Sequence, residues 1–210
     1  MITIGVYGLM LKLAADAAPA LLSVPKLNPL QSMITNNEKF SPEAYRLPNE
    51  TYPTIGYGTR LSPDIRPVLS KLFGQNLNYQ KLVSTNQPIS EPQGRSLLDY
   101  MINSKSNILA SKVPNLPKLP SHLRNQMIDS SYQGSLLGSR KTLDLINKNK
   151  WTEASKQFLN NQEYKNATKL GVPGVRPRME ALSNAMSEFG RTNKTKLTIG
   201  KPTNTPIIRK

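Results

Sequence analysis

The residues of this sequence that could do chemistry lie together in one short segment, residues 38–59, with the sequence EKFSPEAYRLPNETYPTIGYGT. The segment begins with an acid, Glu38, where a helix is expected to end, and it closes with a glycine-rich turn that contains Thr54. A carboxyl group held in a cleft can donate or accept a proton during a reaction. The segment therefore predicts a cleft between a helix end and a β-turn.

Composition excludes several other kinds of site. The chain has 210 residues, no cysteine and one histidine, His122. Without cysteine there is neither a disulfide framework nor a thiolate metal site, and a single histidine argues against a multi-histidine metal centre. We therefore expect neither a metal ion nor an organic cofactor.

The charge balance favours a polyanionic partner. The 28 Lys and Arg residues outnumber the 13 Asp and Glu residues, which gives a formal net charge of +15. Nucleic acid, an anionic envelope polymer and an acidic protein surface would all attract such a chain. Aromatic residues make up only 6% of the sequence, and no DNA-binding motif is recognisable, so the sequence argues against a nucleic-acid partner.

The elements that must position the cleft are mostly helical. A first helix is expected from Asn28-Pro29 to the residues just before Glu38, followed by strand and turn character over residues 45–57. Further helices are expected at 63–73, from Ser90 for about twenty residues, and near 122–132, 136–148, 151–159 and 177–189, with loops or connectors at 74–87 and 113–120. The fold class is therefore α+β, with the β part near the front of the chain.

Both ends of the sequence differ in composition from residues 28–190. Residues 1–27 form an apolar, alanine-rich extension that is interrupted by Lys12, Asp16 and Pro19, which argues against a membrane-spanning helix. We expect this extension to pack on the body of the protein or on a partner. Residues 191–210 contain six Lys and Arg residues and no acid, and they are expected to form a basic extended tail.

Segment 38–59 resembles the phage-type lysozymes, the endolysin muramidases. In that family a glutamate closes the first helix, an aromatic residue and a tyrosine follow, and a β-hairpin carries TIGYGH or TIGIGH. Here Glu38, Tyr45 and the run TIGYG at 54–58 stand in the same order. Weaker similarity continues in DSSYQG at 129–134, KWTEA at 150–154 and GVPGVRPR at 171–178, so that the resemblance covers about Pro29 to Gly190.

This resemblance implies a lysozyme-like fold, in which a long helix joins a small β-hairpin lobe to a mostly helical lobe. It also implies hydrolysis of the β-1,4 bond between N-acetylmuramic acid and N-acetylglucosamine in peptidoglycan. Glu38 would be the general acid that protonates the leaving oxygen, and Thr54 would hold the attacking water. Three further residues would contact substrate by the same resemblance: Tyr45, Gly56 and Tyr57.

The sequence departs from the family where the family has its second catalytic acid. The interval between Glu38 and Thr54 is one residue longer than usual, and the positions that correspond to the acid hold Leu47 or Pro48. Glu50 or Asn49 could take its place, with Glu50 the better candidate. Two readings therefore stay open: an active muramidase, and a catalytically degenerate lysozyme-like structural protein of a phage tail or baseplate.

The resemblance also suggests where the chain acts and what it contacts. Peptidoglycan is the expected partner, and the chain would be located in a phage virion tail, or in the host cytoplasm before release to the cell wall. Residues 1–27 and 191–210 would dock onto other virion proteins and favour the virion-carried version. Arg176 and Arg178 are expected to pair with acids or with the end of a neighbouring helix rather than with glycan.

Overall fold

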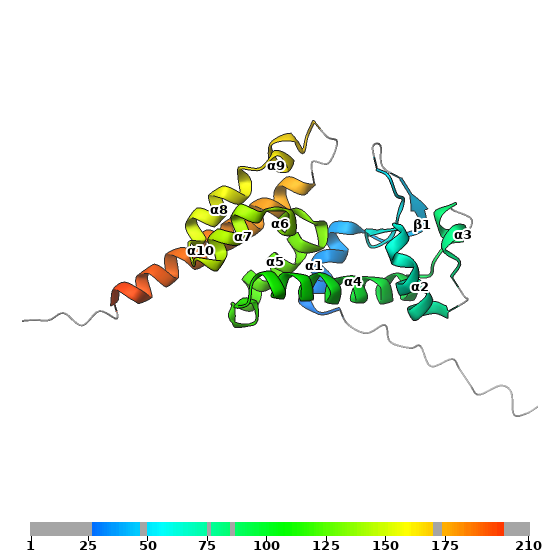
Figure 1. The fold of residues 1–210 in the computed structure, drawn as a ribbon, viewed down its shortest axis with the longest axis horizontal. Helices are drawn as coiled ribbons and strands as arrows, with labels where there is room; N and C mark the ends of the chain where they lie inside the picture. The colour runs from blue at the N-terminus through cyan, green and yellow to red at the C-terminus, as the bar shows by residue number, and fades with distance from the viewer. Residues whose placement is uncertain (1–26, 47–49, 75–76, 85–86, 170–173, 200–210) are drawn as a thin grey trace, which may run out of the picture.

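A computed structural model describes residues 27–46, 50–74, 77–84, 87–169 and 174–199 (Figure 1). The elements in chain order are α1 (Pro29–Glu38), β1 (Ser41–Tyr45), β2 (Thr54–Gly56), β3 (Thr59–Arg60), the 3-10 turn η1 (Pro63–Ile65), α2 (Arg66–Phe73), α3 (Tyr79–Val83), α4 (Glu91–Lys112), the 3-10 turn η3 (Leu116–Lys118), α5 (Ser121–Gln133), α6 (Ser135–Gly138), α7 (Arg140–Asn147), α8 (Trp151–Leu159), α9 (Gln162–Asn166) and α10 (Val175–Ile199). A mostly helical chain with a small antiparallel sheet near its front confirms the predicted α+β class.

Helix α1 delivers Glu38 to the start of the sheet. Asn28 and Gln31 form a reciprocal capping box at its first turn, and Pro29 occupies a position where a missing N–H costs nothing. The helix ends at Glu38, and the chain turns directly into β1 at Ser41, four residues earlier than the strand character that the sequence predicts. Glu38 therefore lies at the junction between the first helix and the sheet.

The sheet has three antiparallel strands in the order β1-β2-β3. Tyr45 on β1 lies opposite Thr54 on β2, and Thr54 in turn lies opposite Arg60 on β3. The turn from β2 to β3 requires left-handed backbone at Gly56 and Gly58, whose φ angles are +65° and +81°. This region of φ favours glycine, which accounts for two of the residues in the TIGYG run.

Two hydrophobic cores meet along the long helix α4, which runs past both groups of elements in Figure 1. One core lies between the sheet, α2, α3 and the first turns of α4; its residues include Ile55, Leu61, Leu69, Leu82 and Leu97. The other core lies among α5, α6, α7, α8 and α10; it includes Met127, Leu136, Phe158, Leu182 and Met186. Neighbouring residues of α4 serve different cores, since Leu97 belongs to the first core and Leu98 to the second.

Several predicted boundaries were wrong. The expected loop at 74–87 contains α3, because Asn78 caps a short helix that buries Leu82. The expected helix at 136–148 is broken into α6 and α7 at Ser139, whose ψ of 69° is not helical. Helix α9 was not predicted.

The largest difference between the predicted and the observed secondary structure lies at the end of the described chain. Helix α10 continues to Ile199, so residues 191–199 are helical rather than extended as predicted. Neither Gly nor Pro interrupts these nine residues, and a helix that is already formed extends at low cost. Residues 1–26 and 200–210, where the docking extensions are predicted, lie outside the described residues. None of the described helices is both long and apolar enough to cross a membrane.

Candidate active site

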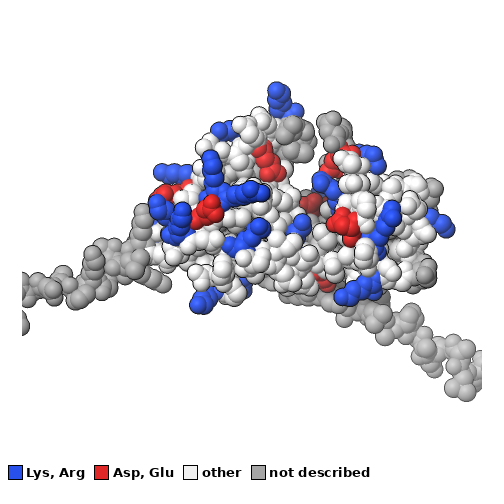
Figure 2. Space-filling model, in the orientation of Figure 1, with Lys and Arg blue, Asp and Glu red and all other residues white. Residues whose placement is uncertain are grey.

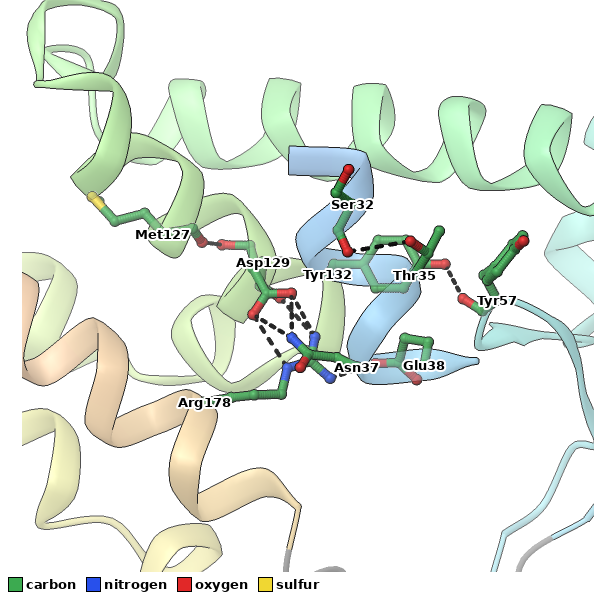
Figure 3. A network of polar contacts seen from close by, with 10 residues as sticks. Ser32, Thr35, Asn37, Glu38, Tyr57, Met127, Asp129, Tyr132 and Arg178 are labelled. Atoms are coloured by element: carbon green, nitrogen blue, oxygen red, sulfur yellow. Dashed lines mark hydrogen bonds and ion pairs between the residues drawn. The ribbon is translucent and has the colours of Figure 1, made fainter. Parts of the chain in front are cut away.

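Three helices that are distant in sequence, α1, α5 and α10, bring the charged side chains of Glu38, Asp129 and Arg178 together (Figure 3). Arg178, in the first turns of α10, donates through Nη1 to Glu38 Oε1. The same guanidinium donates through Nη2 to Asp129 Oδ1 at 2.8 Å and through Nε to Asp129 Oδ2 at 3.2 Å. One cation therefore lies between two carboxylates, Glu38 at the end of α1 and Asp129 on α5.

These three side chains differ in their contact with solvent. Glu38 is 22% exposed, Arg178 12% and Asp129 2%. Burial by itself would lower the pKa of Arg178, but hydrogen bonding and charge attraction from Asp129 and Glu38 outweigh it, and its pKa is raised. The guanidinium is therefore a permanent positive charge at this site.

The β2–β3 turn approaches Glu38 from the other side. A Cβ atom added to Gly58 would lie only 2.7 Å from Glu38 Oε2 and would have to displace that carboxyl, and the φ of +81° also favours glycine at this position. The hydroxyl of Tyr132 on α5 donates to the backbone carbonyl of Tyr57 and fastens the turn to the helical side (Figure 3). The helix end and the glycine-rich turn therefore meet, as the sequence predicts.

A cavity of about 480 Å³ opens beside Glu38. Its walls come from the end of α1, the end of α5 and the start of α10; the lining residues are Asn36, Asn37, Glu38, Gln133, Gly174, Val175, Pro177 and Arg178. The Oε1 atom of Gln133 is buried and has no hydrogen-bond partner among the described residues. The exposed lining residues Asn36 and Asn37 therefore offer side-chain amides, beside the Glu38 carboxyl, to a polar ligand.

Two of the predicted residues, Tyr45 and Thr54, lie opposite each other on the sheet, and Tyr45 lies near both candidate acids. Tyr45 is 40% exposed, and its pKa is raised by partial burial and then by the negative charges of Glu38 and Glu50. Thr54, directly opposite Tyr45, is 8% exposed. The structure therefore places Tyr45 within reach of the charge of Glu38, and Thr54 on the strand beside Tyr45.

Glu50, the second candidate acid, is held less firmly than Glu38. Its Oε1 accepts from Arg60 Nη2 at 3.3 Å, and its Oε2 is buried with no hydrogen-bond partner among the described residues. Its negative charge acts on Tyr45, as that of Glu38 does. Asn49, the other candidate for the second acid's place, lies outside the described residues.

The Tyr57 side chain and the Cα of Gly56 lie inside the protein rather than at the cavity. Tyr57 is 5% exposed; its ring packs beside Phe40 and its hydroxyl donates to Glu91 Oε1 at 3.0 Å. A Cβ atom at Gly56 would contact Ile89 and the backbone of Gly94. This placement does not support the prediction that these two residues contact substrate, because both hold the hairpin against α4.

Asp129 is the residue that the sequence did not identify as part of the site. The expectation that Arg178 pairs with acids is confirmed, but its partners could not be assigned from sequence. The signal for Asp129 in the sequence is the weak similarity of DSSYQG at 129–134 to phage lysozymes, and this similarity gave the acid no role. In the parts of the chain that the structure covers, no group of three or more His, Cys, Asp or Glu residues could hold a metal ion. No protein-family model matches this sequence, and no curated protein matches it either.

Proposed function

We propose that this chain is a muramidase with a lysozyme-like fold, which hydrolyses the β-1,4 bond between N-acetylmuramic acid and N-acetylglucosamine in peptidoglycan. One observation carries the proposal. Three of the four stretches whose sequences resemble phage lysozymes, 38–59, 129–134 and 171–178, are far apart in the chain, yet Arg178 from the last contacts both Glu38 and Asp129 from the other two. Such convergence is what a shared active site requires.

In the proposed reaction, Glu38 acts as the general acid. Cleavage of a glycosidic bond needs a proton on the leaving oxygen while the sugar becomes oxocarbenium-like, and a carboxyl group beside a cavity can supply it. Thr54 would hold the attacking water from the sheet side. Glu50 is the acid proposed to stabilise charge on that side, because its negative charge acts on the same tyrosine, Tyr45, as that of Glu38.

The surface charge suits a cell-wall substrate. Lys and Arg are spread over both ends of the face seen in Figure 2 rather than gathered in one groove. A dispersed positive surface would favour approach to an anionic bacterial envelope without defining a track for a nucleic-acid strand. We therefore propose a phage-encoded enzyme that reaches peptidoglycan from the virion tail or after release from the host cytoplasm.

The test is a reducing-end assay on purified peptidoglycan, with wild type and Glu38→Gln compared. Loss of a general acid should lower the rate by about 10²–10⁴-fold, while circular dichroism shows an unchanged fold. Glu43→Gln is the matched control, because Glu43 is an exposed acid of the neighbouring strand with no side-chain hydrogen bond or ion pair among the described residues. Reducing ends also separate hydrolysis from non-hydrolytic transglycosylation.

Full activity in Glu38→Gln would contradict the proposed mechanism. A wild-type protein that releases no glycan fragments but co-sediments with virion particles would support the alternative, a catalytically degenerate structural protein of the tail or baseplate. The alternative is favoured by one observation: neither Leu47 nor Pro48 supplies a carboxylate.

A further inference from the structure

Asp129 is a buried carboxylate to which the proposed reaction assigns no role. It lies on α5 and is 2% exposed, and the helix around it is buried as well. A charge in such surroundings is retained only when partners satisfy it. Both of its oxygens accept from Arg178, and the Asn37 amide lies at 3.4 and 3.5 Å from them.

The contacts of Arg178 indicate that Asp129, rather than Glu38, fixes the orientation of its guanidinium. Two guanidinium nitrogens, Nε and Nη2, bind the Asp129 carboxylate, and Nη2 also lies 3.4 Å from its backbone carbonyl. Only Nη1 is directed to Glu38. A two-point contact with a planar guanidinium fixes its plane, whereas a single contact does not.

We propose that Asp129 is a positioning residue for Glu38, an inference that rests on the proposed function. It fixes Arg178 in one orientation and offsets much of its positive charge, so that Glu38 is held in place without being locked in its ionised form. An arginine paired with one carboxylate alone strongly favours the charged carboxylate, which cannot donate a proton. Asp129 would reduce that effect.

Few other charged groups face Glu38. From β1, Tyr45 lies near it, and from α5, Tyr132 does; burial is the main cause that raises the pKa of both, so both are neutral at pH 7. Lys39 is exposed, and its charge is screened by water. Among the described groups, Arg178, Asp129 and the more distant Glu50 therefore set the charge around Glu38.

The test replaces the Asp129 charge and follows Glu38 in two independent ways. Asp129→Asn keeps the side-chain size, and Asp129→Ser leaves room for water beside Arg178 if the amide disturbs folding. The first measurement is the pH profile of peptidoglycan cleavage; the second is the ¹³C NMR titration of the Glu38 side-chain carboxyl. Asp144→Asn is the control, because Asp144 is an exposed acid on α7, outside the cluster of Glu38, Asp129 and Arg178.

With Asp129 neutral, Arg178 acts on Glu38 alone and favours its ionised form. We expect the alkaline limb of the activity profile and the midpoint of the NMR titration to move to lower pH, which at pH 7 lowers kcat by about tenfold and leaves KM within about twofold. The Asp144→Asn control should show neither shift.

The two measurements separate failure of this inference from failure of the proposed function. A midpoint that stays in place in both Asp129 variants overturns the inference, whatever the activity. A midpoint that moves in a protein without any glycan cleavage supports the inference about Arg178 and contradicts the muramidase proposal.

Discussion

Glu38 and Glu50 are two acids with the same exposure and very different surroundings. Each side chain is 22% exposed, and each is paired with one arginine. The partner of Glu38, Arg178, is 12% exposed and also binds the buried Asp129, whereas the partner of Glu50, Arg60, is 61% exposed. An exposed pair contributes little to stability, while a buried network is costly to break. The exposure of an acid therefore does not reveal how firmly it is held; the exposure of its partner does.

The largest expected effect comes from removing the buried partner. Arg178→Met leaves Asp129 charged and unpaired, and it should lower the free energy of unfolding by about 3–5 kcal/mol in urea denaturation. The matched variant at the exposed pair, Arg60→Met, should cost less than about 1 kcal/mol. Equal effects of the two substitutions would contradict the comparison.

The next effect concerns the turn beside Glu38. Gly58→Ala places a methyl group 2.7 Å from Glu38 Oε2 and demands a φ of +81° from alanine, so it should cost about 1–3 kcal/mol of stability and displace the carboxyl. Glycan cleavage should fall with it. Gly138→Ala serves as control, because nothing lies within 4 Å of an added Cβ there. Wild-type activity in Gly58→Ala would show that the turn does not position Glu38.

A smaller loss of stability is expected from removing the hydrogen bond between Tyr132 on α5 and the β2–β3 turn. Tyr132→Phe removes the hydrogen bond to the Tyr57 carbonyl and should cost about 0.5–1.5 kcal/mol at pH 7. Burial, the main cause, raises the pKa of Tyr132 in the folded state above the ordinary value of 10.0. The unfolded chain therefore loses this proton first, and stability should fall as pH rises above about 10.

Thermal unfolding followed between pH 8 and pH 11 checks this sign. The decline of stability with pH should be shallower in Tyr132→Phe than in wild type. A decline of the same steepness in both proteins would mean that other groups account for the alkaline loss.

The smallest expected effect on stability is at Glu50. Glu50→Gln should change the free energy of unfolding by less than about 1 kcal/mol, since its ion pair with Arg60 is exposed on one side. Cleavage should nevertheless fall, because a neutral amide cannot stabilise positive charge on the sugar. A rate equal to that of wild type would remove Glu50 from the proposed mechanism.

Local signals in the sequence were sufficient to predict where several helices begin or end. The Asn28 cap and Pro29 set the start of α1, and the Ser90 cap with Pro92 sets the start of α4, because both act on the first turn of their own helix. The predicted bounds of α8, Trp151–Leu159, are those observed. The break at Ser139 was missed, although Gly138, a typical helix-ending residue, stands directly before it.

Some features of the candidate site could likewise be predicted from the sequence, and others could not. By itself the sequence determined that an acid, Glu38, stands at a helix end and that a glycine-rich turn with Thr54 follows, because capping and turn formation depend on neighbouring residues. Only the tertiary structure decided that Asp129 shares Arg178 with Glu38, and that Tyr57 faces α4 instead of the cavity. These outcomes depend on how segments far apart in the chain pack, and the ion pairs form only after that packing has excluded water.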